Sequence, residues 1–225
     1  MEDIKLISLW NSYEEKFNDS YSLIQKNMQD ITQLKVQNFL SSMKPIKIFT
    51  ILTGILWVLV VGTIVTHLFI DAYSKVNPFF LFSATIQVIL TAIAIIVYLY
   101  QLVLIYQVDI SQPVLKTQET LVHLKTSTLW VTRILFLQLP VWTTFFLSKS
   151  MFANGNTWLL ILQGIITLSF AFFAVWFFLN IKYENRNKKW FRLIFNGKEW
   201  TPLLNSMELI NQLNDYKEID KKAST

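Results

Sequence analysis

Four long apolar stretches restrict what this chain can fold into more than any other feature of its sequence. They cover residues 48–70, 79–106, 129–148 and 158–181. Each is long enough for an α-helix to cross a bilayer, which takes ~20 residues, and none shows the polar and apolar alternation of a barrel strand. Only the third contains a charged residue, Arg133. The pattern predicts an all-α membrane protein with four transmembrane helices.

The composition agrees with this prediction and excludes functions that depend on cysteine. Of the 225 residues, 53% are hydrophobic, which is more than a soluble domain of this length usually carries. The absence of Cys excludes disulfides, all-cysteine clusters and thiol catalysis. The first 47 residues are polar and mixed in charge, so we expect the first apolar stretch to act as an uncleaved anchor rather than a signal peptide.

The distribution of Lys and Arg predicts how the chain is oriented. The segment before the first stretch carries six basic residues, the connection between the second and third carries two, and the C-terminal segment carries nine. Each of the other two connections carries one. Because basic residues beside spans stay in the cytoplasm, both termini are predicted to be cytoplasmic. The predicted parts are an N-terminal cytoplasmic segment (1–45), a four-helix transmembrane domain (46–181) and a C-terminal cytoplasmic segment (182–225).

Amphipathic helices are predicted at both ends. Before the first span, apolar residues recur with gaps of three or four, a spacing typical of a heptad-like seam, at Leu6, Trp10, Tyr13, Phe17, Tyr21, Ile24, Met28, Ile31 and Leu34. Pro45 predicts a break or bend between this helix and the membrane. A second amphipathic helix should begin at Thr201 and Pro202. The seam either packs on other helices of the chain or docks a partner protein, for which the candidate residues are Trp10, Tyr13, Phe17, Tyr21 and Ile24.

Four of the uncharged polar side chains inside the predicted spans form a candidate group: His67, Gln87, Gln138 and Gln163. They could line a small polar site for a solute that enters from outside. Alternatively they form hydrogen bonds between helices, which are individually worth about 0.6 to 2 kcal/mol. Since glutamines without a charge make a poor ion site, the second interpretation is favoured.

Signatures of enzymes and metal sites are missing from the sequence. The two histidines, His67 and His123, lie on different predicted helices, and no zinc-protease, phosphate-loop or nucleophile-elbow motif occurs. No Asp or Glu lies inside a predicted span. The chain is therefore predicted to be no enzyme and to need no metal or cofactor.

A basic and aromatic segment, KYENRNKKWFRLIFNGKEW at residues 182–200, directly follows the last span. Its position predicts contact with anionic lipids of the cytoplasmic leaflet, where each Lys or Arg gains about 1 kcal/mol. Docking of a partner stays open, whereas nucleic-acid binding is not predicted so close to the membrane. The lipid-interface candidates are Lys182, Arg186, Lys188, Lys189, Trp190 and Arg192, and Phe191, Phe195 and Trp200 are expected to insert at the interface with Trp190.

Several stretches resemble an uncharacterised family of small four-span inner-membrane proteins of Bacteroidota. They are FLSSMKPIKIFT (39–50), YLYQLVLIYQVDIS (98–111), TLWVTRILFLQLPVWTTFF (128–146) and KYENRNKKWFRLIFNGKEWTP (182–202). The resemblance implies a shared fold in the bacterial inner (cytoplasmic) membrane and brings no catalytic residues. Neighbouring genes for alternative sigma factors are associated with this family, which implies a membrane-held regulator similar to an anti-sigma factor.

These patterns together predict a non-enzymatic regulatory or scaffolding protein that holds a cytoplasmic protein partner at the membrane. The alternative is a small channel or transporter with a Gln-lined site in the outer half of the bundle. A homo-oligomer is compatible with both.

Overall fold

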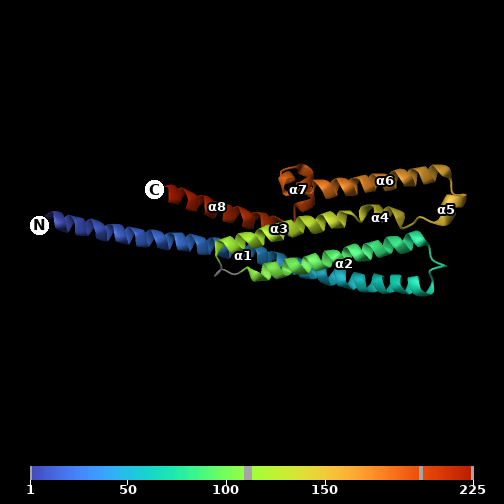
Figure 1. The fold of residues 1–225 in the computed structure, drawn as a ribbon, viewed down its shortest axis with the longest axis horizontal. Helices are drawn as coiled ribbons and strands as arrows, with labels where there is room; N and C mark the ends of the chain where they lie inside the picture. The colour runs from blue at the N-terminus through green and yellow to red at the C-terminus, as the bar shows by residue number, and fades with distance from the viewer. Residues whose placement is uncertain (1, 109–112, 198–199, 224–225) are drawn as a thin grey trace.

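The structure is a computed structural model that describes residues 2–108, 113–197 and 200–223, and the regular structure within these residues is helical throughout. The elements form an elongated bundle in which α1 and α2 run antiparallel, and α3 with α4 and then α6 repeat this course beside them (Figure 1). Their bounds are α1 Glu2–Asp71, α2 Pro78–Gln107, α3 Val114–Phe136, α4 Leu139–Thr144, α5 Lys149–Asn154, α6 Thr157–Asn180, the 3₁₀ turn η1 Tyr183–Asn185, α7 Lys189–Phe195 and α8 Thr201–Ala223.

The two ends of the bundle differ in what they carry. Both chain termini extend from one end, which we call the terminal end, and α5 lies at the other, the loop end (Figure 1). At the loop end, α2 and α6 each begin with an asparagine cap, because Asn77 and Asn156 accept hydrogen bonds from the backbone N–H groups of Phe79 and Trp158. Both helices therefore have a defined start where the chain reverses.

Three helices, α1, α2 and α6, are long and apolar enough to cross a membrane. They correspond to the first, second and fourth predicted spans. The third apolar stretch is not one helix, because α3 ends at Phe136, a turn follows at Leu137 and Gln138, and α4 begins at Leu139. Pro140 explains the interruption, since its ring clashes with the carbonyl of Phe136 and it offers no N–H to that group. A fourth crossing by α3 and α4 together stays a prediction.

The predicted break at Pro45 is wrong, because α1 continues through this residue for its full 70 residues. Side chains on both sides of the proline hold the helix in place: Met43 and Lys47 are completely buried. α1 packs on α2 and α8 in this region (Figure 1). Tertiary packing thus outweighs the loss of one backbone hydrogen bond, and α1 connects the N-terminal segment to the first candidate span as one continuous helix.

The buried core lies mainly at the terminal end. Its side chains come from five helices and include Leu40 of α1, Ile105 of α2, Leu124 of α3, Phe191 of α7 and Leu203 of α8. A smaller cluster of Val65, Leu81 and Ala84 lies toward the loop end. In contrast, Ala174 is the one buried side chain of α6. Outward-facing apolar side chains on a long helix are what a lipid environment accommodates, because lipid tails are as apolar as the side chains themselves.

Candidate functional site

The apolar seam of α1 ends at Leu34, and the part of the helix that follows it has different surroundings. Toward the bundle, Val36, Leu40 and Met43 are completely buried in the core that α8 helps to form. The five candidate partner-binding residues are exposed: Trp10 by 70%, Tyr13 by 67%, Phe17 by 70%, Tyr21 by 41% and Ile24 by 55%. The side chain of Leu6 lies outside the described residues. Met28, Ile31 and Leu34, the last members of the seam, are also exposed, by 39%, 52% and 43%, so the packing of α1 on other helices begins beyond the seam.

The exposed part of the seam extends away from the rest of the protein. The N-terminal part of α1 reaches beyond the C-terminal end of α8 (Figure 1). Its opposite face carries Glu15, Asp19, Ser22 and Lys26, which follow the same spacing of three and four and are all exposed. One face of the helix is therefore apolar and aromatic, and the other is polar.

Side chains of α2 and α6 bond to the broken third stretch. Gln138 donates from Nε2 to Thr91 Oγ1 of α2 at 3.3 Å, and Gln163 of α6 donates from Nε2 to the backbone carbonyl of Thr143 at 2.6 Å. Ser83 and Thr144 share a hydrogen bond between their hydroxyl groups at 3.0 Å.

The same arrangement extends to the loop end. Asn77 donates from Nδ2 to the carbonyl of Leu147. Near the terminal end, Arg133 donates from Nε to the carbonyl of Ile181 at 2.7 Å. Polar groups of the irregular segment are thus bonded to its neighbours, as a membrane interior requires.

Gln87 differs from the other two glutamines. Its side chain is 3% exposed, and its Nε2 has no hydrogen-bond partner among the described residues. It lies one turn before Thr91 on α2, the residue that Gln138 contacts. The structure therefore brings Gln138 close to the α2 face that carries Gln87, and no described contact joins Gln163 to either residue.

His67 does not belong to this group. Its side chain is 77% exposed and its Nδ1 lies 2.6 Å from Oδ2 of Asp71, one turn later on α1. An exposed pair of this kind contributes little to stability. The structure separates His67 from the glutamines with which the sequence grouped it.

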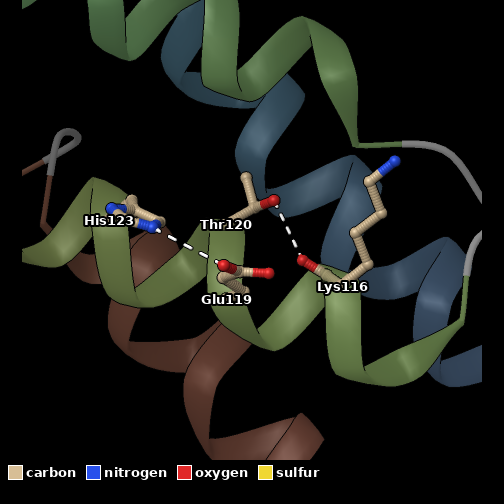
Figure 2. Close-up of polar contacts among 4 residues, drawn as sticks. All are labelled: Lys116, Glu119, Thr120 and His123. Carbon is tan, nitrogen blue, oxygen red and sulfur yellow. Dashed lines mark hydrogen bonds and ion pairs between the residues drawn. The ribbon is translucent and has the colours of Figure 1, made fainter.

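His123 lies on the exposed surface of α3 (Figure 2). Its Nε2 points toward Oε1 of Glu119 at 3.9 Å, and in the preceding turn Thr120 donates its hydroxyl to the carbonyl of Lys116 at 3.0 Å. No group of three or more His, Asp or Glu side chains that could hold a metal ion occurs in the described parts of the chain.

The aromatic residues of the basic segment are not free to insert into lipid. Phe191, Phe195 and Trp200 are 1%, 6% and 4% exposed, and their rings pack on one another. Trp190 packs on Trp176 of α6, with ring centroids 5.0 Å apart. The expected insertion of Phe191, Phe195 and Trp200 is wrong, because α7 turns back toward the end of α6 and buries them in the terminal core.

The bases of this segment remain on the surface. Lys182, Arg186, Lys188, Lys189 and Arg192 are all exposed, whereas Lys198 and Glu199 lie outside the described residues. Arg186 lies over the ring of Tyr183 at 4.6 Å from the centroid, and Lys125 of α3 lies over the same ring at 4.3 Å. Burial lowers the pKa of Lys125, and the positive charge of Arg186 lowers it further. Sequence reasoning missed Tyr183, although its spacing of three from Arg186 was visible.

Lys47 is one of the six basic residues before the first predicted span, and its environment is not predictable from the sequence. The side chain is completely buried between α1 and α2. Its Nζ donates to Oε1 of Gln101 at 2.6 Å and lies 4.6 Å from the ring centroid of Tyr98. Because Lys47 directly precedes the first apolar stretch, its sequence position gives no sign that the ammonium group points inward.

Comparisons with protein-family models, curated proteins and solved structures found no match to this chain. The resemblance to the Bacteroidota family therefore stays a prediction.

Proposed function

We propose that this protein is a non-enzymatic membrane-anchored scaffold or regulator that holds a cytoplasmic protein on the exposed seam of α1. The observation that supports it is the seam's exposure on a helix that is continuous with the first candidate span. The anti-sigma-like role that the family resemblance implies is one form of this proposal, with a sigma factor as the bound protein. In this proposal both termini are in the cytoplasm, and α3 with α4 supplies the fourth crossing.

The size of the exposed seam suits a protein partner. At about 150–250 Å² for each aromatic side chain, the exposed fractions of Trp10, Tyr13, Phe17 and Tyr21 amount to roughly 400–600 Å². Leu9 and Leu23, 59% and 61% exposed, widen the face. A standard interface takes about 800 Å² from each partner, so the aromatic residues alone would supply roughly half of it or more. The patch also reaches the size of the largest apolar patches on monomeric proteins, about 300–600 Å², which are often functional.

The geometry also indicates what kind of surface would bind. Large apolar side chains repeat every three or four residues, as in helices that insert one face into a groove or against a second helix. We therefore expect the partner to supply an apolar groove or an amphipathic helix. Aromatic residues of this kind often dominate binding energy, so loss of Phe17 should cost about 2 kcal/mol or more of the binding free energy.

Site-specific crosslinking in native membranes tests the proposal. A photoreactive residue replaces Phe17 in one variant and Asp19, on the opposite polar face, in a matched control. We expect one stoichiometric protein adduct from position 17 and little from position 19, and this adduct should be lost when Tyr13 and Tyr21 are changed to Ser. Adducts with a second copy of the chain alone, or equal labelling from both positions, would contradict the proposal.

A different observation supports the transport alternative as a second candidate. The third apolar stretch is discontinuous, and Gln87 beside it has a buried amide nitrogen without a described partner. Discontinuous helices line substrate sites in many transporters. Flux of small solutes in reconstituted vesicles that is lost in the Gln87→Leu variant but kept in the Ile86→Leu control would favour transport; silence across common ions and solutes would count against it.

A further inference from the structure

A groove with a volume of about 820 Å³ lies between η1, α7 and the first turns of α8. Its position is tied to the end of a candidate span, because Trp190 of α7 packs on Trp176 and Phe177 of α6 with centroid distances of 5.0 and 6.0 Å. Since α6 ends at Asn180, α7 returns to the last turns of that helix. The groove therefore lies where the predicted fourth span leaves the membrane.

The lining of the groove has two chemical parts. The aromatic side chains of Phe191, Phe195 and Trp200 form an apolar wall that is itself packed into the core. The charged residues that line it are Arg186, Lys189, Arg192 and Glu208. Three positive charges against one negative charge favour an anionic occupant.

Tyr183 concentrates positive charge at this site. Its ring lines the groove and carries two cations, Arg186 on the groove side and Lys125 from α3, whose distances to the ring centroid are 4.6 and 4.3 Å. No described residue forms an ion pair with Lys125, Arg186, Lys189 or Arg192. Charges of one sign repel more strongly near a protein surface than in bulk water, so an anion bound here would relieve the repulsion.

We propose that this groove, which we call the Tyr183 groove, binds the phosphate of an anionic phospholipid from the adjacent leaflet. Arg186, Lys189 and Arg192 would contact the phosphate oxygens, since guanidinium groups match phosphate geometry with two parallel hydrogen bonds. Leu193 belongs to the lining and is 86% exposed, which gives the glycerol and acyl part of the lipid an apolar contact. Because the packing of Trp190 on α6 places the groove at the end of a candidate span, a lipid is favoured over a soluble phosphate compound.

A bound lipid in a defined groove differs from general attraction of bases to an anionic surface. General attraction depends on the number of exposed charges and treats all of them alike. Lys182 and Lys188 are equally part of the basic segment and are exposed, but neither lines the groove. They provide a control with the same change of charge.

The experiment uses the full chain in detergent and measures retention of phosphatidylglycerol by native mass spectrometry. The site variant carries Arg186→Gln and Arg192→Gln, and the matched control carries Lys182→Gln and Lys188→Gln. We expect retention to fall about tenfold or more in the site variant and to change little in the control. Equal losses in the two variants would overturn the proposal and indicate general attraction.

A second readout in the unaltered protein keeps the proposal testable if the site variant folds poorly. Phosphatidylglycerol should raise the pKa of Lys125, observed as slower acetylation of this residue at a fixed alkaline pH, whereas phosphatidylcholine should not. If inorganic phosphate produces the same protection and displaces the lipid, the occupant is a soluble phosphate compound and the lipid assignment is wrong. Protection by neither anion would also overturn it. The crosslinking test at position 17 is independent of these outcomes.

Discussion

The buried contact between Lys47 and Gln101 gives a quantitative test of how α1 and α2 are held together. Both side chains are completely buried, and 2.6 Å separates the Lys47 Nζ from the Gln101 Oε1. A hydrogen bond to a charged group is worth about 1.5–3 kcal/mol, and truncation of Gln101 removes this acceptor from the buried ammonium group. We expect Gln101→Leu to lower the free energy of unfolding by about 2–3 kcal/mol.

The complementary change should cost less. Lys47→Met removes the buried charge together with its desolvation cost. It also leaves the Oε1 of Gln101 without its donor, in a side chain whose Nε2 already has no described partner. We expect a loss of about 1–2 kcal/mol. The double variant Lys47→Met with Gln101→Leu contains neither polar group and should lie within about 1 kcal/mol of the unaltered protein. The coupling free energy between the two positions is then at least about 2 kcal/mol.

Reversible unfolding in mixed micelles, followed by tryptophan fluorescence, measures these differences. Lys44→Met is the matched control, because Lys44 lies one turn earlier, is half-buried, and has its Nζ over the Tyr106 ring at 4.2 Å from the centroid. A cation over an aromatic ring at an exposed site is worth about 0.5–1 kcal/mol, so the control should show a small loss. Additive effects at Lys47 and Gln101, or equal losses for Gln101→Leu and Lys44→Met, would refute this account of the interface.

Three further outcomes follow from the polar contacts. Gln163→Leu should lower the unfolding free energy in the same assay by about 1–2 kcal/mol, because the carbonyl of Thr143 loses its donor inside the bundle. Burial and the charge of Arg186 lower the pKa of Lys125 in the folded chain, so the unfolded chain keeps this proton to higher pH. The charged amine should therefore lower the free energy of unfolding fully at neutral pH. This loss should fade as the pH rises past the folded-state pKa. Arg186→Gln should raise the acetylation midpoint of Lys125, and no rise would contradict the assignment. His67→Ala should change the unfolding free energy by less than about 0.5 kcal/mol, because its pair with Asp71 is exposed to solvent, and a larger loss would show that the pair is coupled to the bundle.

Length and hydropathy were sufficient to locate three of the membrane helices from the sequence. The predicted limits 79–106 and 158–181 differ by one residue from α2 and α6, which span Pro78–Gln107 and Thr157–Asn180. Such boundaries are local, since an apolar run ends where polar residues and an asparagine cap begin. The sequence therefore predicts these elements without any knowledge of their neighbours.

The surroundings of single side chains were not predictable in this way. An aromatic residue beside basic residues is typical of a lipid interface, and Phe191, Phe195 and Trp200 fit that pattern. Their burial depends on the reversal of α7 toward Trp176 of α6, which involves a loop and two helices. Lys47 is a similar case, because a base next to a span looks the same whether its amine faces lipid headgroups or Gln101.

Pro45 and Pro140 show the same limit for the backbone. Each removes one N–H from a helix, yet α1 continues through Pro45 while α3 and α4 are separate helices around Pro140. Pro45 is exposed, so water can reach the carbonyl that it leaves without a donor, and α1 continues between the buried side chains of Met43 and Lys47.

At Pro140 the surroundings are apolar, and the chain instead tightens into a turn in which the N–H groups of Leu137 and Gln138 bond to the carbonyls of Ile134 and Leu135. Side chains of α2 and α6 then bond to the following segment, as with Gln163 and the carbonyl of Thr143. In an apolar interior every polar group needs such a partner. The backbone groups that an interrupted helix leaves unpaired therefore require glutamine and threonine side chains from neighbouring helices. Gln138 and Gln163 thus have a structural explanation that the exposed seam of α1 lacks, which is why the geometry favours docking over transport.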